Sequence, residues 1–216
     1  MRATTRLRAL LTAPGLIVAP GAYDALSARL IAQIGFPVVY MTGFGTAAST
    51  LGQPDIGLLT MSEMVNRAAA LASVVGDVPL IADADTGYGN PINVGRTIRE
   101  YERAGVSALH IEDQVWPKKC GHMEEKQVIP MHEMVQKIHA AVDARHDPDF
   151  VLIARTDANA VNGLDQDMRY ARLSSPAATN TTRLIVVCWK HWLIRSSRKR
   201  VRRTGASPAS GGWRSN

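Results

Sequence analysis

Short apolar runs alternate with longer amphipathic segments along residues 1–160 of this 216-residue chain. Five of the runs are rich in β-branched residues and almost continuously hydrophobic, which is typical of strands buried on both faces of a parallel sheet. We therefore predict five parallel strands. They cover residues 16–19, 37–41, 78–82, 106–111 and 150–154.

The segments between these runs have the periodicity of helices. In residues 23–34, Leu26, Leu30 and Ile34 recur at four-residue spacing and predict an apolar helix face. A second predicted helix begins near Thr60, a third begins after Asn90, and a fourth covers residues 131–145.

Local signals mark two of these helix starts. Thr60 and Glu63 have the spacing of a capping box, in which each side chain bonds the backbone N–H of the other residue. Pro91 follows Asn90 at the first helical position, which proline favours. Both signals predict where a helix begins.

Alternation of strands and helices through five units predicts a parallel α/β architecture. An open doubly wound sheet and a barrel both fit, but APGAYD stands where the former would have a glycine-rich phosphate-binding turn. We therefore favour a parallel (β/α) barrel of the TIM type. Because the alternation stops near residue 166, the barrel is expected to be truncated after its fifth strand, as in a truncated or frame-shifted reading frame.

The net charge of +6 is concentrated at the end of the chain. Residues 168–216 contain 11 basic and no acidic residues, whereas residues 1–167 contain 14 basic and 19 acidic residues. We expect a partial barrel domain over residues 1–166 and an unrelated basic tail over residues 167–216 that is disordered or irregular. Charged runs are usually solvated, so we expect no specific nucleic-acid binding, while non-specific polyanion binding stays open.

Cysteine content and hydropathy bear on the compartment. Two cysteines, Cys120 and Cys188, cannot make a disulfide framework, which favours a reducing compartment. No run approaches the ~18 apolar residues of a membrane-spanning helix. Pro14 and Pro20 interrupt the apolar start, which fits an amphipathic helix and a strand better than a signal peptide. We expect a cytoplasmic protein without membrane association.

Ionisable and hydroxyl-bearing residues stand at the ends of four predicted strands. Since the carboxyl ends of barrel strands converge on one face, where active sites of this fold lie, these side chains are expected to meet. Caps of the following helices would account for one or two of the acids. The residues are Tyr40 and Thr42, then Asp83 and Asp85, then His110, Glu112 and Asp113, then Arg155 and Asp157.

A cluster of carboxylates is expected in this mouth. Asp83 and Asp85 alternate with Ala84, so their side chains point to the same side of a strand. Like charges are unfavourable together unless a cation compensates them. Oxygen ligands favour Mg²⁺, or Mn²⁺, over zinc, and Mg²⁺ keeps several waters. The alternative is that these acids are helix caps and surface charges. The four acids are Asp55, Asp83, Asp85 and Glu112.

The loop KKCGHM, residues 118–123, contains a cysteine among cationic neighbours. Cations lower the pKa of a thiol and suit it to proton transfer or nucleophilic attack, so Cys120 is a candidate catalytic residue. An inert buried cysteine is the alternative. Arg155 matches a carboxylate substrate with its planar fork, or forms a structural ion pair with Asp157 or a loop acid. His110 is a core histidine or a ligand.

Seven segments occur in the order seen in the isocitrate lyase/phosphoenolpyruvate mutase superfamily, and the chain most resembles its methylisocitrate lyase-like branch. The resemblance covers residues 7–165, and KKCGH together with the DAD segment is its most specific part. The segments are GAYDALSARL, YMTGFG, LGQPD, ADADTGYG, HIEDQ, KKCGH and ARTDA.

The resemblance implies a Mg²⁺-dependent carbon–carbon lyase. Such an enzyme cleaves a small 2-hydroxy di- or tricarboxylate to pyruvate or glyoxylate plus succinate or a related acid. It implies that Asp85 holds the metal most directly, with Asp83, Asp55 and Glu112 acting mostly through water. It implies that Cys120 protonates the carbanion, that Tyr40 bonds the cleaved hydroxyl, and that Lys118, Gly121 and His122 shape the cysteine loop. Finally, it implies that the substrate is held by Thr42, Gly43, Phe44, Gly121 and Arg155.

The chain also departs from this family. Phe44 replaces a residue that is small in methylisocitrate lyases, which opens the substrate question. The family implies an eight-stranded barrel and a homo-tetramer with swapped C-terminal helices, and the matching C-terminal part is missing here. Two alternatives therefore stay open: a phosphonomutase or oxaloacetate decarboxylase with the same site, and an inactive family member whose basic tail binds polyanions.

Overall fold

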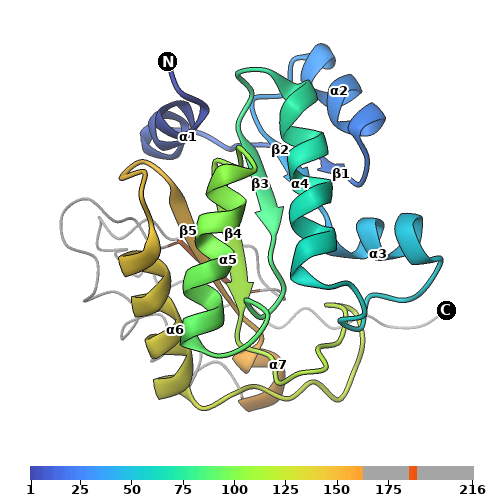
Figure 1. The fold of residues 1–216 in the computed structure, drawn as a ribbon, viewed down its shortest axis with the longest axis vertical. Helices are drawn as coiled ribbons and strands as arrows, with labels where there is room; N and C mark the ends of the chain where they lie inside the picture. The colour runs from blue at the N-terminus through green and yellow to red at the C-terminus, as the bar shows by residue number, and fades with distance from the viewer. Residues whose placement is uncertain (163–184, 189–216) are drawn as a thin grey trace, which may run out of the picture.

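The computed structural model describes residues 1–162 and 185–188, and its strands form a single parallel sheet (Figure 1). Neighbours in sequence are neighbours in the sheet, in the order β1-β2-β3-β4-β5-β6. This consecutive parallel order is that of a TIM-type (β/α) barrel, as predicted. The strands are β1 (Gly21–Ala22), β2 (Val39–Met41), β3 (Leu80–Asp83), β4 (Ala108–Glu112), β5 (Val151–Thr156) and β6 (Ile185–Cys188).

Helices follow the strands, and α4, α5 and α6 lie side by side over one face of the sheet (Figure 1). Both predicted helix starts are confirmed: Thr60 and Glu63 form a capping box, and Asn90 caps a helix whose first residue is Pro91. The helices are α1 (Ala3–Thr12), α2 (Ala25–Ile34), α3 (Gly43–Leu51), α4 (Met61–Val75), α5 (Pro91–Arg103), α6 (Met131–Ala144) and α7 (Ala158–Asn162).

Two hydrophobic clusters hold the sheet in place. The larger one lies between the sheet and its covering helices, and includes the buried Tyr101 and Phe150. The smaller one packs Leu7 of α1 against Val38, Val151 and Ile153. Burial on both faces explains why the central strands are almost continuously apolar.

The first strand lies later in the chain than predicted. The apolar run 16–19 forms no strand, and Leu16 is 87% exposed. The strand is instead Gly21–Ala22, which pairs with Tyr40 and Met41 of β2. Hydrophobicity marked the wrong residues because pairing with a neighbouring strand, and not local composition, determines a short edge strand.

Helix α2 forms as predicted but packs through another face. Leu26 and Ile34, of the predicted apolar face, are 67% and 72% exposed. The helix packs instead through Ala28, which is buried, and through Ile31. These residues are also at helical spacing, so the pattern contains two apolar stripes and does not by itself select between them.

A sixth strand, Ile185–Cys188, follows the five predicted strands and lies within the segment that was predicted to be an unrelated tail. Ile185–Cys188 pairs in parallel with β5 over residues 153–156. An apolar, β-branched segment next to an unpaired strand edge favours this pairing. The rest of the predicted basic tail lies outside the described residues. Within the part of the chain that the structure describes, no helix has the length and apolar character to cross a membrane.

Candidate functional site

The carboxyl ends of β2, β3 and β4 bring Tyr40, Asp83 and His110 together, as expected. The Tyr40 phenol oxygen lies 2.7 Å from His110 Nε2, and the two rings stack. His110 Nε2 lies 3.5 Å from Asp83 Oδ1. Burial lowers the pKa of His110, so the imidazole is mainly neutral, and burial followed by the charge of Asp83 raises the pKa of Tyr40. Tyr40 therefore stays protonated and able to donate a hydrogen bond.

The loop between β2 and α3 is fitted closely around Asp83. The backbone N–H of Gly43 donates to Asp83 Oδ2 at 3.1 Å. A Cβ atom at Gly43 would lie 2.5 Å from that oxygen, so any side chain at this position would displace the Asp83 carboxylate. Thr42 is the N-cap of α3, and its hydroxyl accepts from Gly45 N. Two of the residues expected to hold substrate thus also build the loop at this mouth.

Three carboxylates surround one ammonium group in the Lys118 cluster, which consists of Asp55, Asp83, Asp85 and Lys118. Lys118 Nζ forms an ion pair with Asp55 and lies 2.8 Å from Asp85 Oδ1. Asp85 N donates to Asp83 Oδ1 at 3.0 Å, and Asp85 has a left-handed φ of 47°. All four side chains are buried. The cluster therefore carries more negative than positive charge in a region with little water.

The electrostatics of the Lys118 cluster reflect this imbalance. Burial and the neighbouring charge of Asp83 raise the pKa of Asp85 to about 7. Burial also opposes ionisation of Asp83, but its interactions with His110, Lys118 and Arg155 outweigh burial and lower its pKa to about 2. Burial disfavours the charge on Lys118, yet Asp83 and Asp85 raise its pKa. Asp83 thus stays ionised near neutral pH, whereas Asp85 is partly protonated there.

The donor chemistry of this cluster fits a hard divalent cation. Its donors are carboxylate oxygens, and an added cation would neutralise the excess negative charge that, after burial, raises the pKa of Asp85. Among the described residues, no group of three or more His, Cys, Asp or Glu side chains is arranged around a common metal position. Mg²⁺ needs only one or two carboxylates, because water supplies its other ligands. Lys118 lies between Asp55 and Asp85, where it supplies one positive charge.

A second group of charges, the Asp157 cluster, lies across β4 and β5 and is balanced. Its two carboxylates, from Glu112 and Asp157, face two cations. Arg155 Nη1 lies 2.9 Å from Glu112 Oε2 and Nη2 lies 3.1 Å from Asp157 Oδ2. Arg155 thus forms the ion pair that was the alternative to its predicted role in binding substrate. Burial nevertheless raises the pKa of Glu112 to about 8. The cluster consists of Glu112, Gln114, Lys126, Arg155 and Asp157.

Cys120 is partly buried, and the pKa of its thiol is shifted in the opposite direction to the prediction. Burial, followed by the negative charge of Asp55, raises the pKa of the thiol, whereas we expected cationic neighbours to lower it. The prediction is wrong because Lys118 is engaged with Asp55 and Asp85, so its charge is largely compensated. A thiol with a raised pKa remains protonated at neutral pH, which suits a proton donor better than a nucleophile.

The remaining predicted residues link the cysteine loop to α3. The ring of Phe44 is half exposed and meets the ring of His122 edge-on, with centroids 6.4 Å apart. The carbonyl oxygen of Gly121 accepts a hydrogen bond from Lys126 Nζ at 2.6 Å. Gln114 and Lys126 were not predicted from the sequence, although Gln114 directly follows the strand-end acids and Lys126 lies in the loop that carries Cys120.

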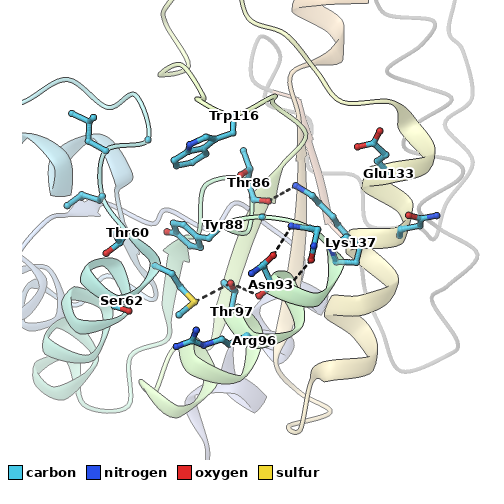
Figure 2. Close-up of a pocket in the computed structure, with 18 residues that line it drawn as sticks. Thr60, Ser62, Thr86, Tyr88, Asn93, Arg96, Thr97, Trp116, Glu133 and Lys137 are labelled. Atoms are coloured by element: carbon cyan, nitrogen blue, oxygen red, sulfur yellow. Dashed lines mark hydrogen bonds between the residues drawn. The ribbon is translucent and has the colours of Figure 1, made fainter.

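A cavity of about 930 Å³ lies outside this group of residues, between the first turns of α4, α5 and α6 (Figure 2). Thr86 and Tyr88 line it, whereas none of the four candidate metal ligands does. Lys137 Nζ donates to the carbonyl oxygen of Thr86 at 3.0 Å (Figure 2). The cavity therefore lies behind the loop that carries Asp85, and Lys137 supports that loop from the cavity side.

Comparison with known proteins places the chain among enzymes of one superfamily. The family model described as phosphoenolpyruvate phosphomutase matches residues 7–175. A 2,3-dimethylmalate lyase of Eubacterium barkeri is 56% identical over 166 residues, which are 77% of this chain and 57% of the relative. A probable 2-methylisocitrate lyase of Corynebacterium glutamicum is 45% identical over 174 residues, which are 81% of this chain and 56% of the relative.

A solved structure agrees with this placement. A phosphonopyruvate hydrolase in complex with oxalate and Mg²⁺ superposes with a TM-score of 0.76 at 36% identity, over 86% of this chain and 63% of that chain. The chain thus spans little more than half the length of the curated relatives it matches. The relatives are lyases and related enzymes that act on small carboxylates, and their names differ in substrate and reaction.

Proposed function

Because this chain belongs to the phosphoenolpyruvate phosphomutase family, within the isocitrate lyase/phosphoenolpyruvate mutase superfamily, we propose that it is a Mg²⁺-dependent carbon–carbon lyase. Its substrate is a small 2-hydroxy di- or tricarboxylate of the 2,3-dimethylmalate or 2-methylisocitrate type. The products are a 2-oxo acid, pyruvate or glyoxylate, and a second carboxylic acid such as succinate.

The observation that carries the proposal is the Lys118 cluster beside a protonated thiol. Asp85, Asp83 and Asp55 would hold Mg²⁺, with Glu112 nearby, and the metal would stabilise negative charge on the oxygens of the 2-oxo acid. Cys120 lies close enough to Asp55 for that charge to raise the pKa of its thiol. The candidate metal ligands and the candidate acid therefore share one mouth.

The proposed reaction balances with these residues. The bond between the hydroxyl-bearing carbon and its neighbour breaks, and the hydroxyl carbon becomes the carbonyl of the 2-oxo acid as its hydroxyl proton passes to water, from which the Cys120 thiolate is later reprotonated. The electron pair remains on the neighbouring carbon, which takes a proton from Cys120 Sγ. Tyr40, which stays protonated, hydrogen-bonds the oxygen at the cleaved position. Thr42, Gly43 and Phe44 contact the 2-oxo acid. Gly121 and Arg155 contact the substrate carboxylates, and Arg155 does so while its guanidinium also pairs with Glu112 and Asp157.

The test is release of pyruvate or glyoxylate by the purified chain, with and without Mg²⁺, from 2,3-dimethylmalate, 2-methylisocitrate and isocitrate. We expect Mg²⁺-dependent release and a loss of at least about a hundredfold in Cys120→Ser, which lacks an effective acid. Cys188→Ser, the variant of the other cysteine, is the matched control. Size-exclusion chromatography of the same samples shows whether each variant is folded and unaggregated.

The outcomes separate this proposal from its alternatives. Release from oxaloacetate alone, at a rate that Cys120→Ser leaves unchanged, would contradict the lyase and favour the decarboxylase. No release from any substrate by a folded sample would contradict activity of this chain. In that case salt-sensitive binding of a polyanion, abolished by deletion of residues 168–216, would support the inactive, polyanion-binding alternative.

A further inference from the structure

The residue before Cys120 is held through its backbone by a buried amide. The Gln114 side chain donates from Nε2 to the carbonyl oxygen of Lys119 at 3.0 Å and accepts from Lys119 N at 2.9 Å. Gln114 itself is 2% exposed. Both backbone groups of Lys119 are therefore tied to one side chain, which fixes the direction in which the chain enters Cys120.

The residue after Cys120 is held by a buried ammonium group. Lys126 Nζ donates to the carbonyl oxygen of Gly121 at 2.6 Å and lies 2.9 Å from Asp157 Oδ1. The side chains of Lys126 and Asp157 are 4% and 0% exposed. Hydrogen bonds that involve charged, buried groups are stronger than those at the surface.

Both attachments converge on one carboxylate. Gln114 Nε2 lies 3.1 Å from Asp157 Oδ2, while Lys126 binds the other oxygen. Asp157 is in turn fixed to the residue that follows β4, because its backbone N–H donates to Asp113 Oδ1 at 2.9 Å. The thiol loop, residues 118–126, is thus attached to the sheet on either side of Cys120.

We propose that Lys126 and Gln114 are positioning residues that hold the Cys120 thiol at the strand mouth, with Asp157 as their common anchor. The inference rests on the proposed function, in which Cys120 is the acid. It goes beyond a structural ion pair, because it states that loss of Lys126 changes the environment of the thiol. The charged groups that act on this thiol are Asp55 and Lys118.

The experiment measures alkylation of Cys120 by iodoacetamide over the pH range in which thiols titrate. All variants are made in a Cys188→Ser background, so that a single thiol reacts. In Lys126→Met we expect alkylation about tenfold faster, because loss of a charged hydrogen bond opens the loop more often. The midpoint of the pH profile should move down toward that of an ordinary thiol, since burial no longer opposes the thiolate. Lys126→Arg should restore most of the wild-type behaviour.

Lys119→Met is the matched control, because it removes a lysine from the same loop. Lys119 Nζ donates to the carbonyl oxygen of Glu124 at 3.2 Å and lies 3.5 Å from Glu125, whose side chain is 90% exposed. Because both contacts are exposed to solvent, loss of the Lys119 ammonium should leave the alkylation rate unchanged. A wild-type rate and pH profile in Lys126→Met would overturn the proposal, and so would equal acceleration in Lys119→Met. Should Lys126→Met fail to fold, Gln114→Met, which leaves the Lys126–Asp157 pair intact, carries the same expectation and the same test.

Alkylation needs no catalytic turnover, so the two proposals fail separately. If the chain has no lyase activity but Lys126→Met still changes the alkylation of Cys120, the proposed function is wrong and the positioning role stands. In an active chain, Lys126→Met should lower kcat while KM stays nearly constant, because the acid and not substrate binding is disturbed. A rise in KM with unchanged kcat would assign Lys126 to substrate binding and overturn its positioning role.

Discussion

The Lys118 cluster and the Asp157 cluster lie at the same sheet edge but differ in charge balance. In the first, one ammonium group pairs with two carboxylates, and a third carboxylate, that of Asp83, lies beside them. In the second, two carboxylates face two cations and an amide that hydrogen-bonds to both. Buried like charges are costly unless they are compensated. The first cluster therefore has capacity for a further cation, whereas the second is complete and serves to fix the thiol loop and β5.

The largest effect is expected from Asp85→Asn, which removes negative charge from the unbalanced cluster. Release of the 2-oxo acid should fall about a thousandfold, since charge stabilisation is a large part of such catalysis. Binding of Mn²⁺, measured by titration calorimetry, should weaken in parallel. Wild-type activity and metal affinity in this variant would show that Asp85 is not a metal ligand and that the contrast between the clusters has no functional meaning.

A large effect on stability is expected from Asp157→Asn, which breaks the balanced cluster. The substitution leaves the buried Lys126 without its carboxylate, and loss of one partner of a buried pair costs about 3 kcal/mol of unfolding free energy. Urea unfolding measures this. Arg103→Ala, which removes an exposed pair with Glu100, is the control and should cost less than about 1 kcal/mol. Equal costs would mean that burial does not distinguish the two pairs.

The smallest effect is a dependence of stability on pH in the metal-free protein. Burial raises the pKa of Asp85 to about 7 and of Glu112 to about 8, so the native state binds more protons than the unfolded chain between about pH 5 and pH 8. The free energy of unfolding should therefore fall as the pH rises through this window. Asp83, with its pKa lowered to about 2, contributes in the opposite sense, and only in acid.

Urea unfolding at a series of pH values measures this slope. Glu112→Gln should flatten it, because the amide does not titrate, and Mg²⁺ should reduce it by favouring the ionised carboxylates. A slope that Glu112→Gln leaves unchanged would show that Glu112 is not the titrating group.

Local signals in the sequence predict features that depend on near neighbours. The capping box of Thr60 and Glu63 and the helix start at Asn90 and Pro91 are confirmed, because each involves residues within one turn. Strand–helix alternation predicts the parallel sheet for a similar reason, since each strand is buried on both faces whatever its neighbours are. The exposed face of α2 could not be predicted, because two apolar stripes compete and tertiary packing selects one.

In the candidate site, too, the sequence predicts which residues lie at the strand ends but not which residues they contact. The positions of Asp83, His110 and Glu112 at strand ends predict that they converge, because the sheet is parallel. Their neighbours in space could not be predicted, since Lys118 meets Asp55 across 63 residues of sequence and Lys126 meets Asp157 across 31. The pairing of Lys118 also explains why the pKa of Cys120 is raised and not lowered as expected. Lys118, two residues before Cys120, is bound to carboxylates from other loops.

The sequence by itself determined the parallel (β/α) architecture, the family, and which residue types gather at the strand ends. Those features follow from periodicity and from short motifs, whose physics is local. Only the tertiary structure decided which charges compensate one another, that one cluster keeps an excess of carboxylates while the other is balanced, and that Gln114 and Lys126 hold the thiol loop. Such pairings depend on distances between residues that are remote in the chain, and on burial, which strengthens electrostatic interactions by excluding water.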